Sequence, residues 1–380
     1  MANTLTNLAA DIYKAADMVG RELTGLIPSV TINGGSEAAA LNDTVRSHFT
    51  RAATVTTISP AMTIPEGTDQ TVDTKTLTLD TTASVKIPWT GEDIKHVNNG
   101  SGFETVYGDQ MKQAFRAIAN QIESDLWAAM RKGASRAYGT AGTTPFGSNF
   151  NDIPQLRKIL ADNGMPFDGQ ATLAINTSAG ANLRSLAQLQ KANEAGGAEL
   201  LRQGTLLDLQ GFMLKESAAI TSVTKGTGSG YLMNGAGAIA DTTLTVDTGT
   251  GTILAGDIIT IATGSTSYRY VVNTALSGGS VVIGSPGLRV AEADNNAITV
   301  GNDFTPNLAF HKSAAEIAIR PMADPPGGDL AVDTMVVQDP WSGLVFEVKA
   351  YKGFKKAMFM VSCVYGVKAW KPNHIAILLG

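Results

Sequence analysis

Side chains that could carry catalysis or bind a metal are few in this sequence and lie far apart. The four histidines, His48, His96, His311 and His374, include no pair spaced one helical turn apart, so only folding could cluster them. Metal sites need clustered ligands. The motifs of serine hydrolases, zinc proteases, paired redox cysteines and phosphate-binding loops do not occur. The sequence therefore predicts no enzymatic activity, no metal and no cofactor.

Three further patterns could suggest a site, and each has a simpler interpretation. Lys225–Gly230 is as rich in glycine as a phosphate-binding loop, but strands follow it where such a loop opens a helix. Asp241, Asp247 and Asp257 lack the glycine and terminal glutamate of a calcium loop. The only cysteine, Cys363, lies in an apolar run and reads as a buried thiol. We interpret the glycine run as a flexible junction.

Charged side chains that could pair with another protein gather between residues 66 and 95, where carboxylates and lysines interleave. A solvated polar face would explain them. Ion pairing across a subunit interface would explain them too, because charge complementarity sets register and partner choice more than affinity. With one basic residue of the terminal segment added, the candidate interface residues are Arg21, Glu66, Asp69, Asp73, Lys75, Lys86, Glu92 and Asp93.

The elements that must position these residues begin with an arm. Apolar residues at three- and four-residue spacing predict an amphipathic helix over residues 5–26, ended by Pro28, and residues 29–46 read as a loop. Alternating Thr- and Val-rich runs from Phe49 to Trp89, around turn residues 60–73, predict a long two-stranded excursion. Since an isolated hairpin is marginally stable in water, it needs another surface to lie on.

The middle of the chain contains its clearest helix. Apolar periodicity predicts a helix over residues 103–134, with Ser101 as candidate N-cap and a length of roughly 45 Å. Residues 135–150 read as a linker and 152–222 as an α+β region. That region is expected to contain the helices Ile153–Asn163 and Ser178–Ala195 and the strand Ala171–Ile175.

Residues 223–304 have a different texture, in which charges nearly vanish and Gly, Thr, Ser and Val dominate. Short strands at regular spacing favour a small β-barrel or sandwich. The strands expected here are Thr243–Asp247, Ile258–Ala262, Tyr268–Val272, Val281–Ile283 and Ala297–Val300. Residues 305–380 return to strand-rich mixed texture, so an all-β insert separates two α+β halves.

Composition excludes several classes of protein. The 380 residues are 43% hydrophobic and 17% charged, include 40 glycines and carry a net charge of −5. Such a chain fits either a β-rich protein or a surface largely covered by neighbours. No run of Lys or Arg marks a nucleic-acid footprint. Neither a secretion signal nor an apolar run of about 20 residues is present, so we expect a cytoplasmic, membrane-free protein.

The order of these parts resembles the major capsid (coat) proteins of tailed bacteriophages, which share the Hong Kong 97-type fold. It is most similar to the branch that carries an inserted β-barrel domain. The most similar stretches are Phe49–Asp93, Leu254–Ile261 and Val364–Pro372. The resemblance covers nearly the whole chain and depends on the order and spacing of the elements rather than on one motif.

The resemblance implies an α+β capsid fold with a spine helix and an extended loop that lies on a neighbouring subunit. It divides the chain into an arm and loop (1–46), an extended hairpin loop (47–93), a peripheral domain with the start of an axial domain (94–222), an inserted barrel (223–304) and axial return strands (305–380).

The resemblance also implies self-assembly, through hexameric and pentameric capsomers, into an icosahedral virion capsid built in the host cytoplasm. The shell would enclose double-stranded DNA without sequence-specific binding, with scaffolding and portal proteins as partners. Some relatives cross-link a loop lysine to an asparagine, but no matching asparagine motif is evident here, so no cross-link is predicted. Alternatives are an encapsulin-like compartment shell, a β-rich virion adhesin or binding module, and a hydrolase of unfamiliar family. The long helix weighs against the adhesin or binding module. The missing catalytic groups weigh against the hydrolase.

Overall fold

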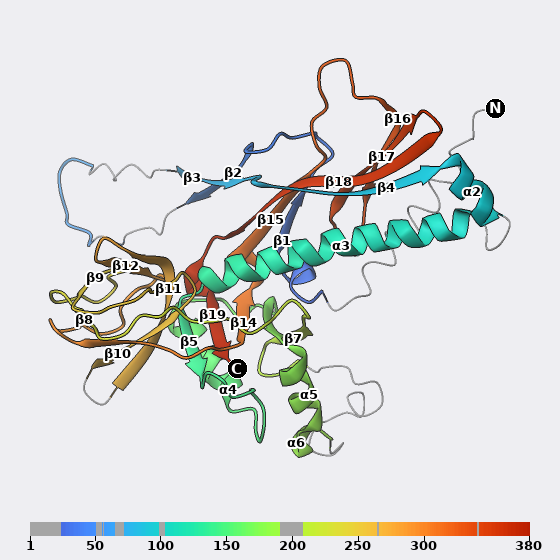
Figure 1. Cartoon of the computed structure of the whole chain (residues 1–380). Coiled ribbons are helices and arrows are strands. Elements are labelled where there is room, and N and C mark those ends of the chain that lie inside the picture. Colours follow the sequence, from blue (N-terminus) through green and yellow to red (C-terminus); the bar gives the residue numbers. More distant parts are fainter. Residues whose placement is uncertain are drawn as a thin grey trace.

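Strands and one long helix build most of the chain. The computed structural model describes residues 24–50, 55, 57–64, 72–98, 103–190, 208–263, 266–339 and 342–380. Within them the fold is mixed α+β, as the sequence predicts, and strands outnumber helices. Two large sheets and a separate two-stranded hairpin share the strands (Figure 1).

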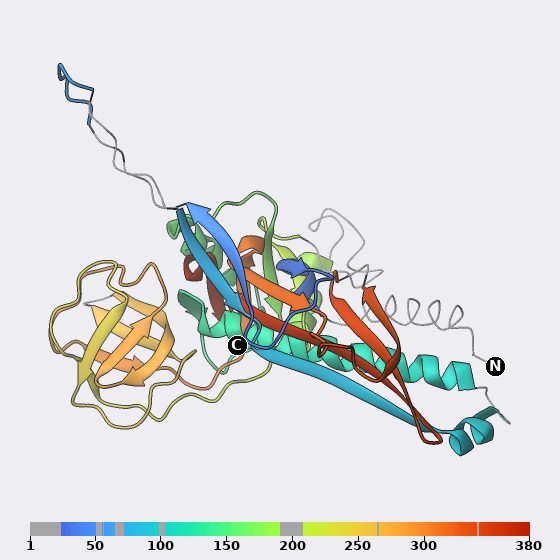
Figure 2. The same cartoon turned by 90° about the horizontal axis from the view of Figure 1, so that it is seen from above.

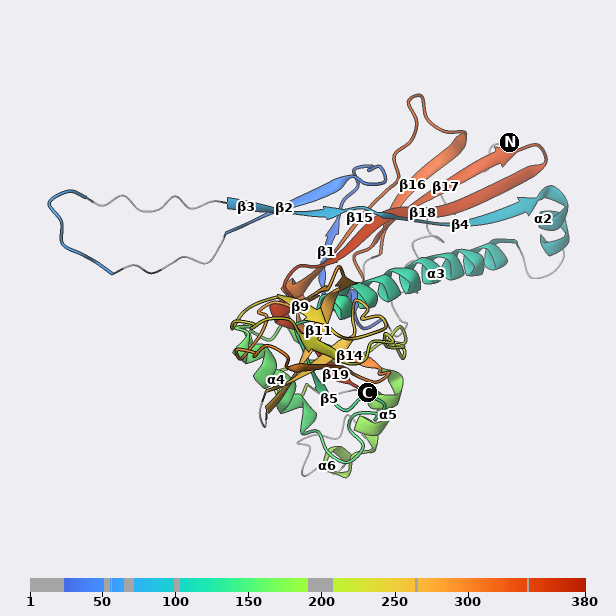
Figure 3. The same cartoon turned by 60° about the vertical axis from the view of Figure 1, so that its left-hand side comes forward.

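The first sheet lies against the long helix α3 (Phe103–Lys132), which runs along one of its faces (Figure 3). Its central strand, β18, is long enough to pair with β15 near one end and with β17 and β4 near the other. The six strands are β1 (Thr31–Gly34), β15 (Ala315–Arg320), β18 (Lys356–Ala369), β17 (Val345–Gly353), β16 (Ala331–Gln338) and β4 (Thr81–Thr90).

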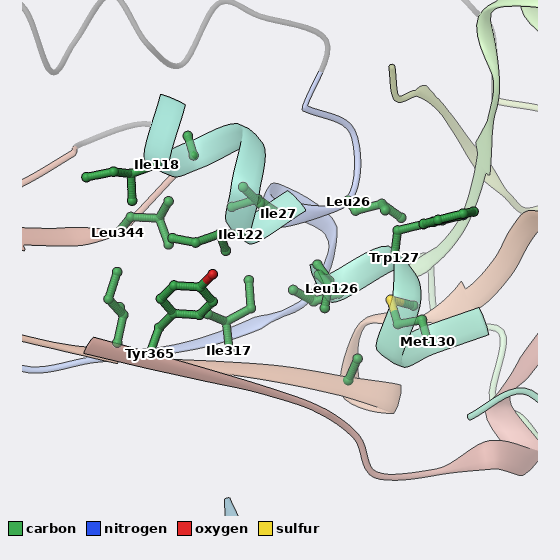
Figure 4. Close-up of a cluster of buried hydrophobic side chains, with 14 of the residues drawn as sticks. Leu26, Ile27, Ile118, Ile122, Leu126, Trp127, Met130, Ile317, Leu344 and Tyr365 are labelled. Atoms are coloured by element: carbon green, nitrogen blue, oxygen red, sulfur yellow. The ribbon is translucent and has the colours of Figure 1, made fainter. Parts of the chain in front are cut away.

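Helix α3 packs on this sheet through one apolar stripe, as its spacing of three and four residues requires. Side chains of the stripe are almost fully buried, including Phe115, Ile118, Ile122 and Leu126. In the close-up of Figure 4, Ile118, Ile122, Leu126 and Met130 from α3 lie beside Leu344, Ile317 and Tyr365 from the sheet side. The helix and sheet therefore share one hydrophobic core.

A buried carboxylate on α3 holds the backbone at Leu26 and Ile27 against the helix. The carboxylate of Glu123 accepts hydrogen bonds from the backbone N–H groups of Leu26 (2.8 Å) and Ile27 (2.9 Å) and from the Ser217 hydroxyl (2.7 Å). The two backbone bonds satisfy N–H groups at the start of the short helix η1 (Ile27–Ser29), which have no partner within the helix. Burial raises the pKa of Glu123, although the three donors oppose that shift.

The second sheet contains eleven strands, six of which close a barrel. The order β10-β13-β8-β9-β12-β11 returns on itself because β10 also pairs with β11. These strands are β8 (Tyr231–Met233), β9 (Thr243–Asp247), β10 (Ile258–Thr263), β11 (Thr266–Ser277), β12 (Ser280–Ile283) and β13 (Ala297–Val300). The chain enters and leaves this barrel where Val223 and Phe304 pair.

We call the fold outside the barrel the body. The barrel and the body share hydrogen bonds as well as a chain connection. The sheet continues from β11 through β5 (Arg136–Gly139), β19 (Ile375–Leu379), β14 (Pro306–His311), β6 (Ala171–Ile175) and β7 (Met213–Glu216). At the junction, the N–H of Val271 donates to the carbonyl of Ser135 (3.1 Å). A Cβ at Gly284 would lie 2.2 Å from the Ala134 carbonyl oxygen, so only glycine permits this approach.

Three further helices pack against the second sheet outside the barrel. A separate cluster of buried apolar side chains joins α4 (Asp152–Asp162), α5 (Thr177–Ser185) and α6 (Ala187–Gln190) to β6, β14 and β19. Two short helical turns, η2 (Lys312–Ala314) and η3 (Pro372–His374), precede β15 and β19. Helix α2 (Gly91–Asn98) directly follows β4 of the first sheet.

Four expectations about local structure need correction. The expected loop 29–46 contains β1, which is held by parallel pairing with β15, and the expected linker 135–150 contains β5, a strand between β11 and β19. The helix expected over 178–195 is interrupted at Leu186, and residues 191–207 lie outside the described part. Thr24–Leu26 is not helical, while residues 1–23 and Ser101 lie outside the described part.

The long excursion is also shorter than its sequence pattern implies. Antiparallel pairing joins β2 (Thr44–Thr50) to β3 (Val72–Thr78), with Thr44 opposite Thr78. The strand that includes Val85–Pro88 is β4, which pairs with β18 in the first sheet and does not belong to the hairpin. The division of the chain into five parts remains a prediction.

Candidate interaction surface

The β2–β3 hairpin carries apolar side chains away from the body. Figure 2 shows its described tip, residues 57–64, far from both sheets. Three apolar residues there, and Val55 beside them, are almost completely exposed: Val55 (95%), Ile58 (92%), Met62 (107%) and Ile64 (95%). Soluble monomers rarely expose apolar side chains in groups, so such a group marks a contact site.

The root of the hairpin rests on the end of β18. A Cβ at Gly366 would lie 2.0 Å from the carbonyl oxygen of Thr78, so the backbones of β18 and β3 are in direct contact. A small apolar cluster fills the junction and includes Leu77, Leu79 and Val364. The root is therefore fixed to the body, whereas the tip is not covered by the described part of its own chain.

Three lysines surround one tryptophan at this root, and we call Lys75, Lys368, Trp370 and Lys371 the lysine–tryptophan patch. The ammonium groups of Lys368 and Lys75 lie 4.8 Å and 5.6 Å from the centre of the Trp370 ring. Burial, followed by the positive charges of Lys371 and Lys368, lowers the pKa of Lys75. The chain thus concentrates positive charge beside an aromatic face.

Three of the other predicted interface residues, Lys86, Glu92 and Asp93, do not join this patch. Lys86 is exposed on β4, on the rim of a cleft of about 500 Å³ between β4 and α3. Glu92 and Asp93 lie in the first turn of α2, which follows the end of β4 away from the hairpin (Figure 1). The structure therefore separates the lysines and carboxylates that the sequence shows close together.

Asp93 has a local structural role. The Thr90 hydroxyl (2.5 Å) and N–H (3.3 Å) donate to its carboxylate, and its own N–H donates to the Thr90 hydroxyl (3.1 Å). This reciprocal pair is a capping box at the start of α2. The hydrogen bond from the Thr90 hydroxyl lowers the pKa of Asp93 most.

Four predicted interface residues have no described side chain. Arg21, Glu66 and Asp69 lie outside the described residues. Asp73 lies in β3 opposite Phe49, and only its backbone is described. Their roles remain predictions.

Sequence reasoning missed Lys368, Trp370 and Lys371 as candidate interface residues. They lie about 300 positions from Lys75 in the chain, so no spacing pattern connects them. The nearest signal is the stretch Val364–Pro372, which carries the family resemblance but shows no charge partner. Only the packing of β3 across β18 brings them together.

A potentially reactive side chain elsewhere in the fold, that of Lys349, has a structural role. Lys349 is buried, and its ammonium pairs with Asp324, with Asp329 (3.2 Å) and with Glu347 (3.4 Å). Burial lowers the pKa of Lys349, but hydrogen bonds from its ammonium to Asp324 and Asp329 outweigh burial and raise it overall. An amine that stays charged is a poor nucleophile, so this cluster anchors the 321–330 loop rather than performing chemistry.

The structure also places the glycine run, the cysteine and two of the histidines. Lys225–Gly230 leads into strand β8, and the Gly226 N–H donates to the buried carboxylate of Asp257 (3.0 Å). Cys363 is buried, which raises its pKa to about 12. Contrary to their separation in sequence, the rings of His311 and His374 lie 6.1 Å apart.

No group of three or more His, Cys, Asp or Glu residues among the described residues is arranged to hold a metal ion. The same part of the chain contains no helix that is both long and apolar enough to span a bilayer.

Comparison with known proteins gives matches in structure alone. No family model matches the chain, and no curated protein matches it. Among solved structures, one titled Mycobacterium phage Che8 is 17% identical, with 89% of this chain and 84% of that chain covered and a TM-score of 0.46.

Two further matches have similar values. The capsid of cyanophage P-SCSP1u is 12% identical, with 93% and 87% of the two chains covered and a TM-score of 0.49. A virus-like particle from Pyrococcus furiosus is 10% identical, with 97% and 96% covered and a TM-score of 0.41.

Proposed function

We propose that this chain is the major capsid protein of a tailed bacteriophage, a non-enzymatic subunit that assembles with copies of itself into an icosahedral shell around the genome. One observation carries the proposal. The β2–β3 hairpin projects from the body and presents Val55, Ile58, Met62 and Ile64, each at least 92% exposed (Figure 2). Burying these side chains on another copy removes apolar surface from water, which favours association.

The geometry of the hairpin suits assembly of many copies. A projecting element that binds a different surface on its neighbour makes a head-to-tail contact, and such contacts close into rings and shells. An adhesin module would instead require a binding face for a foreign ligand. No described feature favours that alternative or a compartment shell without a genome.

The proposal assigns a role to each part of the chain. The hairpin within 47–93 is the extended loop, and 94–222 forms the peripheral domain with α3 as spine and the start of the axial domain. Residues 223–304 are the inserted barrel, 305–380 complete the axial domain, and 1–46 form the arm. Capsomers, scaffolding and portal proteins, and double-stranded DNA held without sequence readout are the proposed partners, in a virion assembled in the host cytoplasm.

Polar substitution at the hairpin tip tests this function. Purified wild-type chain is expected to form shells or capsomers visible by electron microscopy. The variant Ile58→Ser/Met62→Ser/Ile64→Ser should fold normally, because these side chains are fully exposed, yet fail to assemble. Circular dichroism checks the fold and sedimentation checks the assembly.

The matched control is Ile239→Ser, which replaces an apolar residue that is 65% exposed on a barrel loop. It should leave assembly unchanged. A wild-type chain that stays monomeric at high concentration, or a tip variant that assembles normally, would refute the proposed function.

A further inference from the structure

Two short segments connect strands of the first sheet to strands of the second, and each contains a histidine. Residues 311–314 lead from β14 to β15, and residues 370–374 lead from β18 to β19 (Figure 1). We propose that these histidines, His311 and His374, form a pH-sensitive joint that holds the two sheets in one arrangement at neutral pH and loosens in acid. The joint lies within one chain, so it operates whether or not the chain assembles.

The joint is a break between two ladders of paired strands. Strands β15 and β18 pair as far as Ala315 opposite Ala369, and β14 and β19 pair as far as Phe310 opposite Ile375. The backbone hydrogen bonds that cross the break between them both end on the Ala314 carbonyl, at 2.7 and 3.2 Å. Hinges are typically a few residues at the ends of elements, and these two segments have that position.

The two histidine rings meet inside this break. Their centres lie 6.1 Å apart, with the ring planes at 78°. Both residues are buried, His311 at 6% and His374 at 9% exposed. The Nδ1 atom of His374 has no hydrogen-bond partner among the described residues. A proton bound to that nitrogen would therefore be buried without an acceptor, which is unfavourable.

Positive charge already lies near His374. Burial, then the charges of Lys371 and His311, lower the pKa of His374 to about 4. The Lys371 ammonium donates to the Ser313 hydroxyl (3.3 Å), which lies 2.9 Å from His311 Nδ1. The carboxylate of Asp168 lies 3.1 Å from His311 Nε2, so it contacts His311 rather than His374. Protonation of His374 therefore adds a charge beside like charges.

Other elements around the joint bring carboxylates that are engaged elsewhere. On α4, Asp162 lies 3.9 Å from the guanidinium of Arg136. On β15, Glu316 accepts a hydrogen bond from the Trp370 indole N–H (2.7 Å). Helix η2 adds a further exposed lysine. Within the described residues no carboxylate forms an ion pair with His374, so its charge has no direct counter-ion.

Acid therefore shifts the joint towards an open arrangement. A histidine that reaches water has a pKa near 6.5, whereas the pKa of His374 in the closed joint is about 4. Between these two pH values the open form binds a proton that the closed form does not. Opening should become more favourable by about tenfold or more from pH 7 to pH 5. Above about pH 6.5 both forms are neutral and the joint stays closed.

Hydrogen–deuterium exchange of the full chain, measured by mass spectrometry, tests the joint. After correction for the intrinsic pH dependence of exchange, peptides that cover 311–314 and 370–374 should lose protection by about tenfold or more between pH 7 and pH 5. Peptides from β6 and β17, inside the second and the first sheet, should keep theirs.

Three variants identify the group responsible. His374→Phe keeps a ring but binds no proton, so it should abolish the acid-dependent loss of protection. Lys371→Gln, at an exposed position, should reduce the loss, because the lysine charge no longer opposes protonation of His374. His96→Gln, at an exposed histidine of α2, is the control and should behave as wild type.

The outcomes decide the proposal without reference to assembly. Full protection of the wild-type joint at pH 5, or an undiminished loss in His374→Phe, shows that the histidine pair is not a pH-sensitive joint. Equal loss over both sheets shows that acid unfolds the whole chain, which also overturns the joint. If His374→Phe does not fold, an undiminished loss in Lys371→Gln contradicts the proposal. Shell formation is a separate measurement, so the proposed function stands or falls independently.

Discussion

At the scale of single residues, burial rather than chemistry explains most unusual titratable groups. His374 is buried in η3, and its Nδ1 atom has no hydrogen-bond partner among the described residues. His311 and Lys371 lie near it, and His311 Nε2 in turn lies 3.1 Å from the Asp168 carboxylate. Burial, then the charges of Lys371 and His311, lower the pKa of His374 to about 4.

This lowered pKa predicts acid sensitivity. Above about pH 6.5 His374 is neutral in both folded and unfolded chains, and its contribution to stability is complete. As the pH falls towards 4, the unfolded chain binds a proton that the folded chain does not, so stability is lost. His374→Phe keeps a ring and removes the proton site. Its unfolding free energy relative to wild type should therefore rise as the pH falls through this window.

Urea unfolding at several pH values measures the difference. His96→Gln, at an exposed histidine of α2, is the control and should run parallel to wild type. If the His374→Phe curve also runs parallel to wild type, His374 does not titrate differently in the two states.

At the scale of elements, close backbone contact decides where glycine is required. Gly366 lets β18 pass directly over the end of β3, with no room for a Cβ. Gly108 in α3 faces open space, where a Cβ would meet nothing within 4 Å. The same residue type therefore has opposite significance at the two positions.

Alanine substitutions should show this contrast. Gly366→Ala should destabilise the chain by about 1–3 kcal/mol, since an added methyl must displace backbone. Gly108→Ala should stabilise it by about 0.5–1 kcal/mol, because alanine is the better helix former. Denaturant unfolding of both variants checks the prediction. Equal effects of the two substitutions would contradict the close contact between β18 and β3.

At the scale of the whole molecule, the barrel is joined to the body by a polar seam. Arg136 in β5 pairs with Tyr270 in β11 of the barrel. Its side chain donates to the Ile159 carbonyl and to the Asn163 amide oxygen, both at 3.2 Å. A Cβ at Gly256 would lie 2.3 Å from the Arg131 guanidinium, so the barrel loop lies directly on the end of α3. The barrel is therefore a structural part of the body.

Removing the barrel should weaken what remains. Replacing residues 224–303 by a short linker should lower the melting temperature of the body by about 5 °C or more, because β5 loses its neighbour and buried polar groups lose cover. Gly284→Val, which crowds the seam in the full chain, should also lower it. Differential scanning calorimetry measures both. An unchanged melting temperature after excision would show that the barrel is a passive insert.

Local sequence patterns determined the elements whose periodicity is strong. The stripe from Phe115 to Met130 predicts α3, and the expected strands Ala171–Ile175, Thr243–Asp247 and Ala297–Val300 match β6, β9 and β13 end to end. A local pattern suffices to predict these segments, because their apolar spacing fits one geometry. Strands β1 and β5 were missed because pairing with distant strands holds them, and no local pattern records a partner far away in the chain.

From the sequence alone, few side chains are spaced for catalysis or metal binding. The sequence also places acidic and apolar residues together around residues 55–73. Only the tertiary structure decided which charges meet. It placed Lys75 beside Lys368 and Lys371, nearly 300 positions away, and it separated Lys75 from Lys86 and Glu92, which are its neighbours in sequence. The physical reason is that β3 packs across the end of β18, so charge proximity follows a contact between distant parts of the chain rather than position along it.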